Sequence, residues 1–253
     1  MFQPARNFRS FNLVLSSSFS STKQKFLFFF GAPGVGKGTF AQFLARDYGF
    51  NQIATGDEIR KILKSQEVPG FSKELVSQIR ETVKAGKLVS DDVVVQIIKE
   101  KLLEEKSKNG VIFDGFPRTL SQLEKYEATL PTHLVINIFL NESILIEKAM
   151  GRRTCVGCGK SYNICNIHRD GYEMDPLLPK VKDQCDKCKD KLVIRDDDKE
   201  NIIKDRLKEY NLKTAPLLEV YKKRGIVFDF EPKRGVKDYD NFLAQLKPYI
   251  EKI

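Results

Sequence analysis

Long hydrophobic runs are missing from this 253-residue sequence, and cysteine is scarce. A membrane-spanning helix needs about 18 consecutive apolar residues, and no uninterrupted run here approaches that length. We therefore expect no membrane span. The chain has five cysteines, an odd number in a chain long enough to bury a core of its own. That count argues against a secreted scaffold held by disulfides and favours a metal site or free thiols.

Acidic residues are absent before Asp47, whereas residues 1–25 carry Arg6, Arg9, Lys23 and Lys25 among a cluster of serines. A basic, serine-rich and acid-free composition is typical of organelle transit peptides. We expect residues 1–24 to address the protein to an organelle, with the mitochondrial matrix as first candidate and a plastid-type organelle as second. The alternative is a disordered tail without an addressing role on a cytosolic protein.

Positive charge exceeds negative charge along the chain. Lys and Arg together number 43 and Asp and Glu 34, which gives a formal net charge of +9. Such a surplus fits nucleic acid, an anionic membrane surface or a highly phosphorylated small molecule. Composition does not choose among these three partners.

From residue 25 onward, short apolar runs alternate with longer segments of helical periodicity. This alternation is typical of βα units around a parallel sheet with helices on both faces. We expect strands at 26–30, 51–54, 111–113, 134–140 and 226–230, and helices at 37–48, 91–106, 144–150 and 197–210. A helical insert at 55–89 and a Cys-, Gly- and Asp-rich segment at 151–198 interrupt the alternation. The prediction is one α/β core at 25–253 with two inserts.

A glycine-rich loop follows the first expected strand and opens a helix, as a phosphate-binding loop (P-loop) requires. Its glycines let backbone N–H groups turn toward phosphate oxygens, and the helix N-terminus adds positive partial charge. Lys37 then reaches the outer phosphates, and the hydroxyl of Thr39 stands one place later than in the general pattern. A chance glycine-rich turn is the alternative. The predicted triphosphate-binding residues of the loop are Gly34, Val35, Gly36, Lys37, Gly38 and Thr39.

Four motifs in order resemble the adenylate kinase family, specifically its long-lid type. They are Gly31-Ala32-Pro33-Gly34-Val35-Gly36-Lys37-Gly38-Thr39, Thr55-Gly56-Asp57-Glu58-Ile59-Arg60, Asp114-Gly115-Phe116-Pro117-Arg118-Thr119 and Gly151-Arg152-Arg153. The resemblance covers residues 26–230. It implies a P-loop nucleoside monophosphate kinase with a five-stranded parallel sheet, an AMP-binding insert at 55–89 and a lid at 151–198. Such an enzyme transfers the terminal phosphoryl group of a Mg²⁺-bound nucleoside triphosphate to AMP.

The resemblance also implies a role for each matching residue. Implied catalytic residues are Lys37, Arg118, Arg152, Arg195, Arg206 and Asp114, the last organising water around Mg²⁺. Lys148 and Arg152 join the P-loop in triphosphate binding. Implied AMP-binding residues are Thr55, Arg60, Lys87, Val89, Gly115, Arg118, Gln122, Arg195 and Arg206. The planar fork of arginine suits bidentate contacts with phosphate.

Two donor-side features depart from the family pattern. Lys148 stands where the family usually carries an arginine that stacks on the donor base, and lysine keeps the charge but not the planar surface. The loop at 229–236 is longer than the usual one, and it lacks the glycine of an Asp-Gly pair whose backbone reads the donor base. ATP and GTP are therefore equal candidates for the donor.

Cys155-x-x-Cys158 and Cys185-x-x-Cys188 form two hooks whose spacing is typical of a tetrahedral structural zinc site. Disulfides or free thiols are the alternative. The resemblance supports zinc, because long-lid members of some lineages carry a four-cysteine site here. The loop between the hooks is longer than usual and contains Cys165 and His168, either of which could substitute as a ligand. We expect instead a free buried thiol and a surface imidazole.

Two other functions compete with the kinase. In the first, the zinc-hook segment is a nucleic-acid-binding ribbon on a P-loop scaffold; in the second, the chain is a GTPase switch. Segment 151–198 has Tyr162 and Tyr172 as its only Phe, Trp or Tyr residues, and acidic residues offset its lysines and arginines. This composition argues against a stacking platform for single strands. We expect nucleotides as partners, no nucleic acid and, from the resemblance, a monomer.

Overall fold

The computed structural model describes residues 24–65, 73–84, 89–103 and 109–253. The expected transit segment up to residue 23, Lys87, and the end of the helix expected at 91–106 lie outside the described residues. Within the described part of the chain, no helix combines the length and apolar character that a membrane crossing requires.

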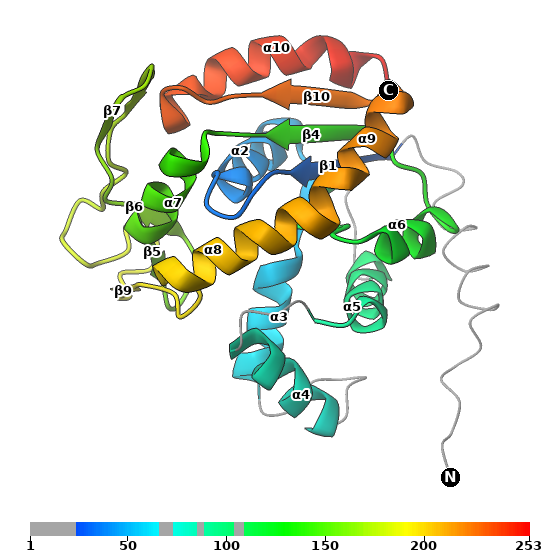
Figure 1. Cartoon of the computed structure of the whole chain (residues 1–253), viewed down its shortest axis with the longest axis horizontal. Helices are drawn as coiled ribbons and strands as arrows, with labels where there is room; N and C mark the ends of the chain where they lie inside the picture. The colour runs from blue at the N-terminus through cyan, green and yellow to red at the C-terminus, as the bar shows by residue number, and fades with distance from the viewer. Residues whose placement is uncertain (1–23, 66–72, 85–88, 104–108) are drawn as a thin grey trace.

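Five parallel strands form the central sheet in the order β10-β4-β1-β3-β2 (Figure 1). Their bounds are β1 Lys25–Phe30, β2 Asn51–Ala54, β3 Gly110–Asp114, β4 Leu134–Ile138 and β10 Val227–Phe230. All five expected strands form. β3 is longer than expected, because Gly110 and Asp114 continue the pairing with β1. β4 ends before the expected Leu140, because its pairing with β10 ends at Ile138.

Helices cover both faces of the sheet, as expected, and alternate residues of β1 point to opposite sides. Leu27 and Phe29 pack with α2 (Lys37–Tyr48), α7 (Glu142–Gly151), α8 (Glu200–Glu209) and α10 (Tyr239–Glu251). Phe26, Phe28 and Phe30 pack with α5 (Asp91–Leu103), α6 (Leu120–Glu127) and α9 (Ala215–Lys223). β1 is therefore buried on both faces, which explains why its sequence is apolar throughout.

Two helices begin at other residues than expected. The helix expected from Asp197 begins at Glu200; before it, Asp198 forms an ion pair with Arg152 of β5, and Asp197 forms one with Arg206 of the helix itself. α7 begins at Glu142, not Ile144 as expected, because backbone N–H groups of its first turn, including that of Ile144, donate to Asn141 O.

The two predicted inserts contain most of the remaining elements. The described residues of the first form α3 (Thr55–Lys64) and α4 (Lys73–Lys84). The second folds into two small antiparallel sheets, β6-β5-β9 and β7-β8, whose strands the sequence did not predict. Their bounds are β5 Arg152–Cys155, β6 Ser161–Asn163, β7 Ile167–Arg169, β8 Tyr172–Met174 and β9 Leu192–Val193. A π-helical turn, η1 (Tyr210–Thr214), joins α8 to α9, and a 3-10 turn, η2 (Gly235–Asp238), precedes α10.

Candidate active site

The glycine-rich loop joins β1 to α2 at the carboxyl edge of the sheet. Gly31 has φ 138°, and a Cβ there would lie 2.2 Å from Ile138 O, so this position requires glycine. Gly36 caps α2 with φ 104°. The Lys37 Nζ donates to Gly31 O at 2.7 Å and to Ala32 O at 3.0 Å. The loop therefore curls around its own lysine at the start of a helix, the arrangement that binds phosphate.

Gly38, the departure from the general P-loop pattern, has a steric explanation. A Cβ at this position would lie 2.9 Å from Oδ2 of Asp114, which ends β3. Burial raises the pKa of Asp114, and Lys37 opposes that shift. Burial lowers the pKa of Lys37 to about 8, Asp114 opposes this shift, and Arg118 and Arg206 add to it. The site is thus strongly positive around one partly buried carboxyl group.

A pocket extends from the P-loop toward the carboxyl ends of β2 and β3. Its charged lining includes Lys37, Arg60, Arg118 and Arg206. Arg118 donates from Nε to Gly115 O at 2.8 Å. Burial, followed by the neighbouring Arg206, lowers the pKa of Arg118 to about 10, so it is charged at neutral pH. Arg60 forms an ion pair with Asp57 on α3. These cations fit a phosphate-bearing ligand.

The far end of this pocket is suited to a base. Its lining includes the apolar side chains Ile59, Val83, Val89 and Val94 together with Thr55, Gly115 and Gln122. The hydroxyl of Thr55 is buried and has no hydrogen-bond partner among the described residues. A buried hydroxyl without a partner is costly, so a ligand that supplies one would be favoured here.

The amide of Gln122 is fixed by two hydrogen bonds. Its Oε1 accepts from the backbone N–H of Arg118 at 2.8 Å, and its Nε2 donates to Asp91 Oδ1 at 2.8 Å. The second oxygen of Asp91 accepts from the Thr119 hydroxyl at 2.9 Å. The sequence analysis gave Asp91 and Thr119 no role in the site. Asp91 lies 31 residues from Gln122, and the only sequence signal was an acidic residue in the first turn of a helix.

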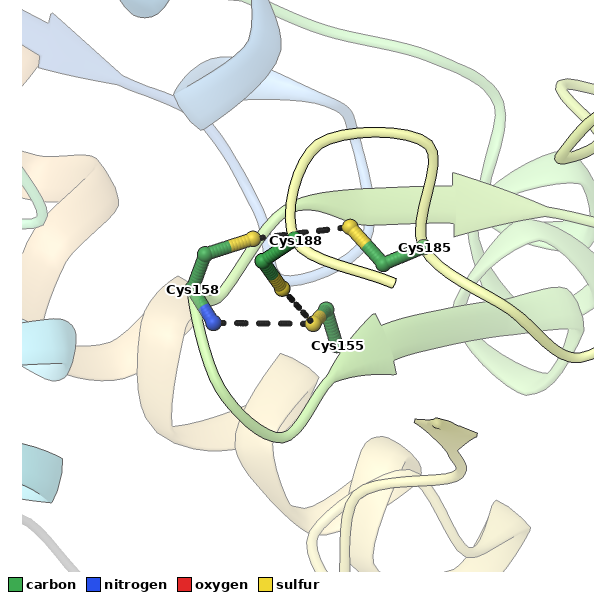
Figure 2. Close-up of side chains that lie close together, drawn as sticks. All are labelled: Cys155, Cys158, Cys185 and Cys188. Carbon is green, nitrogen blue, oxygen red and sulfur yellow. Dashed lines mark hydrogen bonds between the residues drawn. The ribbon is translucent and has the colours of Figure 1, made fainter. Parts of the chain in front are cut away.

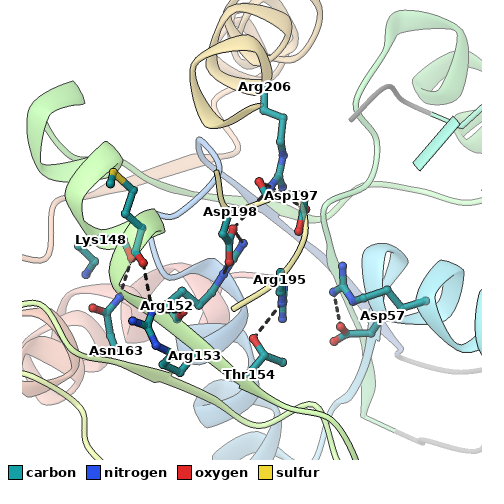
Figure 3. A network of polar contacts seen from close by, with 12 residues as sticks. Asp57, Lys148, Arg152, Arg153, Thr154, Asn163, Arg195, Asp197, Asp198 and Arg206 are labelled. Carbon is teal, nitrogen blue, oxygen red and sulfur yellow. Dashed lines mark hydrogen bonds and ion pairs between the residues drawn. The ribbon is translucent and has the colours of Figure 1, made fainter. Parts of the chain in front are cut away.

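Arg152 of the lid and Arg206 of α8 are held by neighbouring side chains (Figure 3). Arg152 forms a two-pronged ion pair with Asp198, whose Oδ2 lies 2.8 Å from Nε. Arg206 Nη1 lies 2.7 Å from Asp197 Oδ2. Arg206 and Asp197 line the pocket, whereas Arg152 does not line it.

Arg195 lies in the same network. Its Nε donates to the Thr154 hydroxyl at 2.9 Å. Burial lowers the pKa of Arg195 to about 9, and the nearby charges of Arg152 and Arg60 act in the same direction. Although Arg195 does not line the pocket either, these mutual effects mean that the predicted arginines form one cluster of positive charge.

The structure places Lys148 apart from the pocket. Its Nζ lies 3.4 Å from the sulfur of Met174, a residue of β8. Burial lowers the pKa of Lys148 to about 8. Because α7 packs against the P-loop, with Ala149 Cβ 2.8 Å from a Cβ built on Gly34, Lys148 still lies on the P-loop side of the molecule.

The four hook cysteines converge (Figure 2). Their sulfur atoms all lie within 4.8 Å of one another. The Cys155–Cys188 distance is 3.3 Å and the Cys158–Cys185 distance is 3.5 Å. Zn–S bonds of about 2.3 Å in a tetrahedron place sulfurs about 3.8 Å apart, so the four thiols fit zinc.

The remaining cysteine lies outside this cluster. Cys165 donates from its thiol to Glu147 O at 2.9 Å, and its side chain is partly buried. His168 is exposed, and its Nε2 contacts Asn166 Oδ1 at 2.8 Å. Neither is part of the four-sulfur group. His168 is a surface imidazole, as expected, whereas the thiol expected to be buried is only partly buried.

Comparison with known proteins identifies the family. A family model described as adenylate kinase matches residues 29–226. The chain belongs to the adenylate kinase family. It is 40% identical over 218 residues to chloroplastic adenylate kinase 1 of Arabidopsis thaliana, covering 83% of this chain and 73% of that protein. It is 36% identical over 225 residues to the GTP:AMP phosphotransferase of Plasmodium falciparum, covering 87% and 95%. It is 36% identical over 232 residues to adenylate kinase of Archaeoglobus fulgidus, covering 90% and 98%.

Proposed function

We propose that this family member transfers the terminal phosphoryl group of a Mg²⁺-bound nucleoside triphosphate to AMP. The observation that carries the proposal is a single pocket that joins the P-loop lysine to an apolar end containing Thr55 and Gln122, with Arg118 and Arg206 in its wall. Two nucleotides bound with their phosphates at these cations would meet end to end. Such positioning is most of what phosphoryl transfer asks of a protein.

AMP binds at the end of the pocket toward β2 and β3 in this proposal. Arg60 and Arg118 hold its phosphate, and the fixed amide of Gln122 reads its base beside the Thr55 hydroxyl. Among the described residues, the guanidinium of Arg118 donates only from Nε. Its terminal nitrogens therefore keep donors for the phosphate, since a guanidinium has five N–H groups.

The triphosphate binds on the loop at 31–39, with Lys37 at its outer phosphates. Mg²⁺ arrives with the triphosphate and neutralises charge on its outer oxygens. The carboxyl group of Asp114, which lies against the start of α2, is positioned to hold water around that ion. These residues orient the phosphoryl group for direct attack by the AMP phosphate, without a covalent enzyme intermediate.

The lid supplies the remaining charge. Asp197 and Asp198 now hold Arg206 and Arg152 by ion pairs, which keeps both guanidinium groups close to the reaction site before a nucleotide binds. With both nucleotides present, Arg152, Arg195 and Arg206 surround the transferring group, and the lid excludes water that would otherwise hydrolyse the donor. Zinc at the four cysteines would hold the lid together; the sulfurs fill its four positions and leave none for a catalytic water.

A coupled assay for ADP tests this proposal. The purified protein should form ADP from a triphosphate only when AMP is present, and Lys37→Met protein prepared in the same way should be inactive. Comparing ATP and GTP at fixed AMP identifies the donor. Triphosphate hydrolysis that does not require AMP would contradict the proposal and favour a GTPase.

We further propose an organelle location, with the mitochondrial matrix before a plastid-type organelle. The relatives from Arabidopsis thaliana and Oryza sativa that bear the name chloroplastic support an organelle, and the basic segment 1–24 supports targeting. A reporter fused to residues 1–25 should enter that organelle, and diffuse cytosolic signal would contradict this. A monomer without affinity for nucleic acid is also proposed, and light scattering and filter binding test it.

A further inference from the structure

Two of the segments that we expect to be longer than the family's usual pattern lie against each other. One is the lid hairpin, residues 167–174, formed by β7 and β8; the other is the β10 loop, residues 231–238. The backbone N–H of Glu173 donates to Lys233 O at 2.9 Å. Figure 1 shows the hairpin beside the loop that leads from β10 to α10. Two separate insertions in the sequence thus form one structural unit.

Side chains strengthen this contact at both ends of the hairpin. The Tyr172 hydroxyl donates to the Glu231 carboxylate, and the Lys233 ammonium lies 4.1 Å from the centre of the Tyr172 ring. Asp175, just past the hairpin, forms an ion pair with Lys237. Tyr172 is only 1% exposed. The hairpin is therefore fixed to the core and does not project freely into solvent.

This unit lies where the donor nucleoside would extend. The P-loop follows β1, the middle strand of the sheet, while the AMP pocket uses residues after β3 and β2. A second nucleotide with its phosphates on the P-loop must then extend toward the ends of β4 and β10. The β10 loop follows one of these strands, and the backbone N–H of Asn141, which follows the other, donates to the Tyr172 hydroxyl at 3.1 Å.

Met174 connects the hairpin to the P-loop side. It is 3% exposed, its side chain lies 3.7 Å from a Cβ built on Gly235, and its sulfur is 3.4 Å from Lys148 Nζ. A thioether is a weak acceptor, whereas an ammonium has three donors. Among the described residues, the Lys148 ammonium has no stronger acceptor than this sulfur. A ligand that presents two acceptors along one edge would satisfy the remaining donors of this ammonium.

We propose that the lid hairpin, through Met174, holds the Lys148 ammonium at the edge of the donor base and selects guanine over adenine. Guanine presents two adjacent acceptors, O6 and N7, whereas adenine presents N7 and the N6 donor. This inference rests on the proposed phosphoryl transfer and names its donor as GTP. In it Met174 is a positioning residue, and Lys148 contacts the base.

The test measures kcat/KM for GTP and for ATP at saturating AMP in the full-length protein. The wild type should favour GTP by about 5- to 150-fold, the discrimination of a two-acceptor contact. Lys148→Met should bring the GTP:ATP ratio close to one. Met174→Ala should lower the ratio at least threefold, and Met174→Leu, which keeps the packing volume but lacks the sulfur acceptor, should restore only part of it. Met150→Ala is the matched control, because Met150 lies on the same helix as Lys148 and is 44% exposed.

Two results would overturn the proposal. The first is a wild type whose kcat/KM is as high for ATP as for GTP. The second is that Lys148→Met and Met174→Ala change kcat/KM for GTP and for ATP equally, as they would if the hairpin only restrained the lid. If Met174→Ala does not fold, as its thermal midpoint would show, Lys148→Met decides the matter. A wild type that forms no ADP from either triphosphate and AMP refutes the proposed function instead, so the two failures are distinct.

Discussion

The proposed acceptor side and the proposed donor side of this site are built in different ways. On the acceptor side, Asp91, Thr119 and Gln122 come from helices of the core or the turn before them, and their side chains form a closed hydrogen-bond network. On the donor side, Tyr172 and Met174 come from the lid hairpin, which the β10 loop holds in place. The acceptor geometry is therefore fixed by the packing of the core, whereas the donor geometry depends on the lid. Variants on the two sides should separate by which nucleotide they affect.

The largest effect is expected where the two sides meet, at Arg118. Its guanidinium is buried beside Arg206 and lines the pocket next to Lys37. Arg118→Ala should lower kcat/KM by about 10²- to 10³-fold with either donor, because it removes a donor aimed at developing phosphate charge. Steady-state kinetics of ADP formation measures this.

Arg118→Lys serves as its control. It keeps the positive charge but loses the planar fork, so its activity should fall between those of the wild type and Arg118→Ala. If Arg118→Ala retained more than a tenth of wild-type turnover, the proposed role of Arg118 would be wrong.

Removal of zinc should destabilise the lid on the donor side and leave AMP binding on the acceptor side unchanged. Metal analysis should find about one zinc per chain, and Cys155→Ser or chelation should lower the midpoint of thermal unfolding by about 10 °C. AMP binding should persist in the metal-free protein, because the AMP pocket is lined by core and α3–α4 residues. Calorimetry with AMP measures the second part.

The fifth cysteine provides a matched control for zinc. Cys165 lies outside the four-sulfur group and donates to a backbone carbonyl, which a serine hydroxyl can also do. Cys165→Ser should therefore keep both zinc and stability. Purified wild type with four titratable hook thiols and no zinc would contradict the metal assignment.

A smaller effect, limited to AMP, is expected at Asp91. A carboxylate only accepts hydrogen bonds, so it fixes which way the Gln122 amide faces. Asp91→Asn removes that constraint and should raise KM for AMP about 5- to 10-fold, the cost of about one hydrogen bond. KM for the triphosphate should not change. Initial rates with AMP varied at saturating donor measure this.

The neighbouring carboxylate, Asp92, provides the matched control. The Asp92 side chain is 84% exposed and forms an ion pair with Lys125 at the surface, so Asp92→Asn should leave both KM values within about twofold, since exposed ion pairs contribute little. Equal effects of the two substitutions on KM for AMP would show that loss of charge, and not the Gln122 contact, is responsible.

Sequence patterns predicted what depends on neighbours along the chain. The helix at 37–48 and the strand at 51–54 form with the predicted bounds, because their apolar periodicity and the surrounding glycines are local signals. The partners of Gln122 and Tyr172 were not predicted. Asp91 is 31 residues from Gln122, and Glu231 is 59 residues from Tyr172. No periodicity encodes such contacts, which arise only when the sheet brings loop ends together.

The smallest expected effect is the change in triphosphate binding between pH 7 and pH 8. Burial lowers the pKa of Lys37 to about 8, with Asp114 opposing the shift and Arg118, Arg206 and Arg152 adding to it. An unfolded lysine has a pKa of about 10.4. Below pH 8 the ionised ammonium of Lys37 therefore lowers the stability of the nucleotide-free fold. This destabilisation disappears as the pH rises toward 10.4. Bound phosphates favour the charged form, so the Kd of the triphosphate should increase about twofold from pH 7 to pH 8 and about tenfold by pH 9.

Two lysines could produce this profile, since burial also lowers the pKa of Lys148 to about 8. Lys148→Arg separates them, because arginine stays charged over this range. If Lys37 is responsible, as we expect, the pH dependence of Kd measured by calorimetry persists in Lys148→Arg. If it disappears there, the titrating group belongs to the donor-base contact and not to the phosphate contact. In that case the Kd of GTP should depend on pH more steeply than that of ATP, because the ammonium donates to two acceptors of guanine and to only one of adenine.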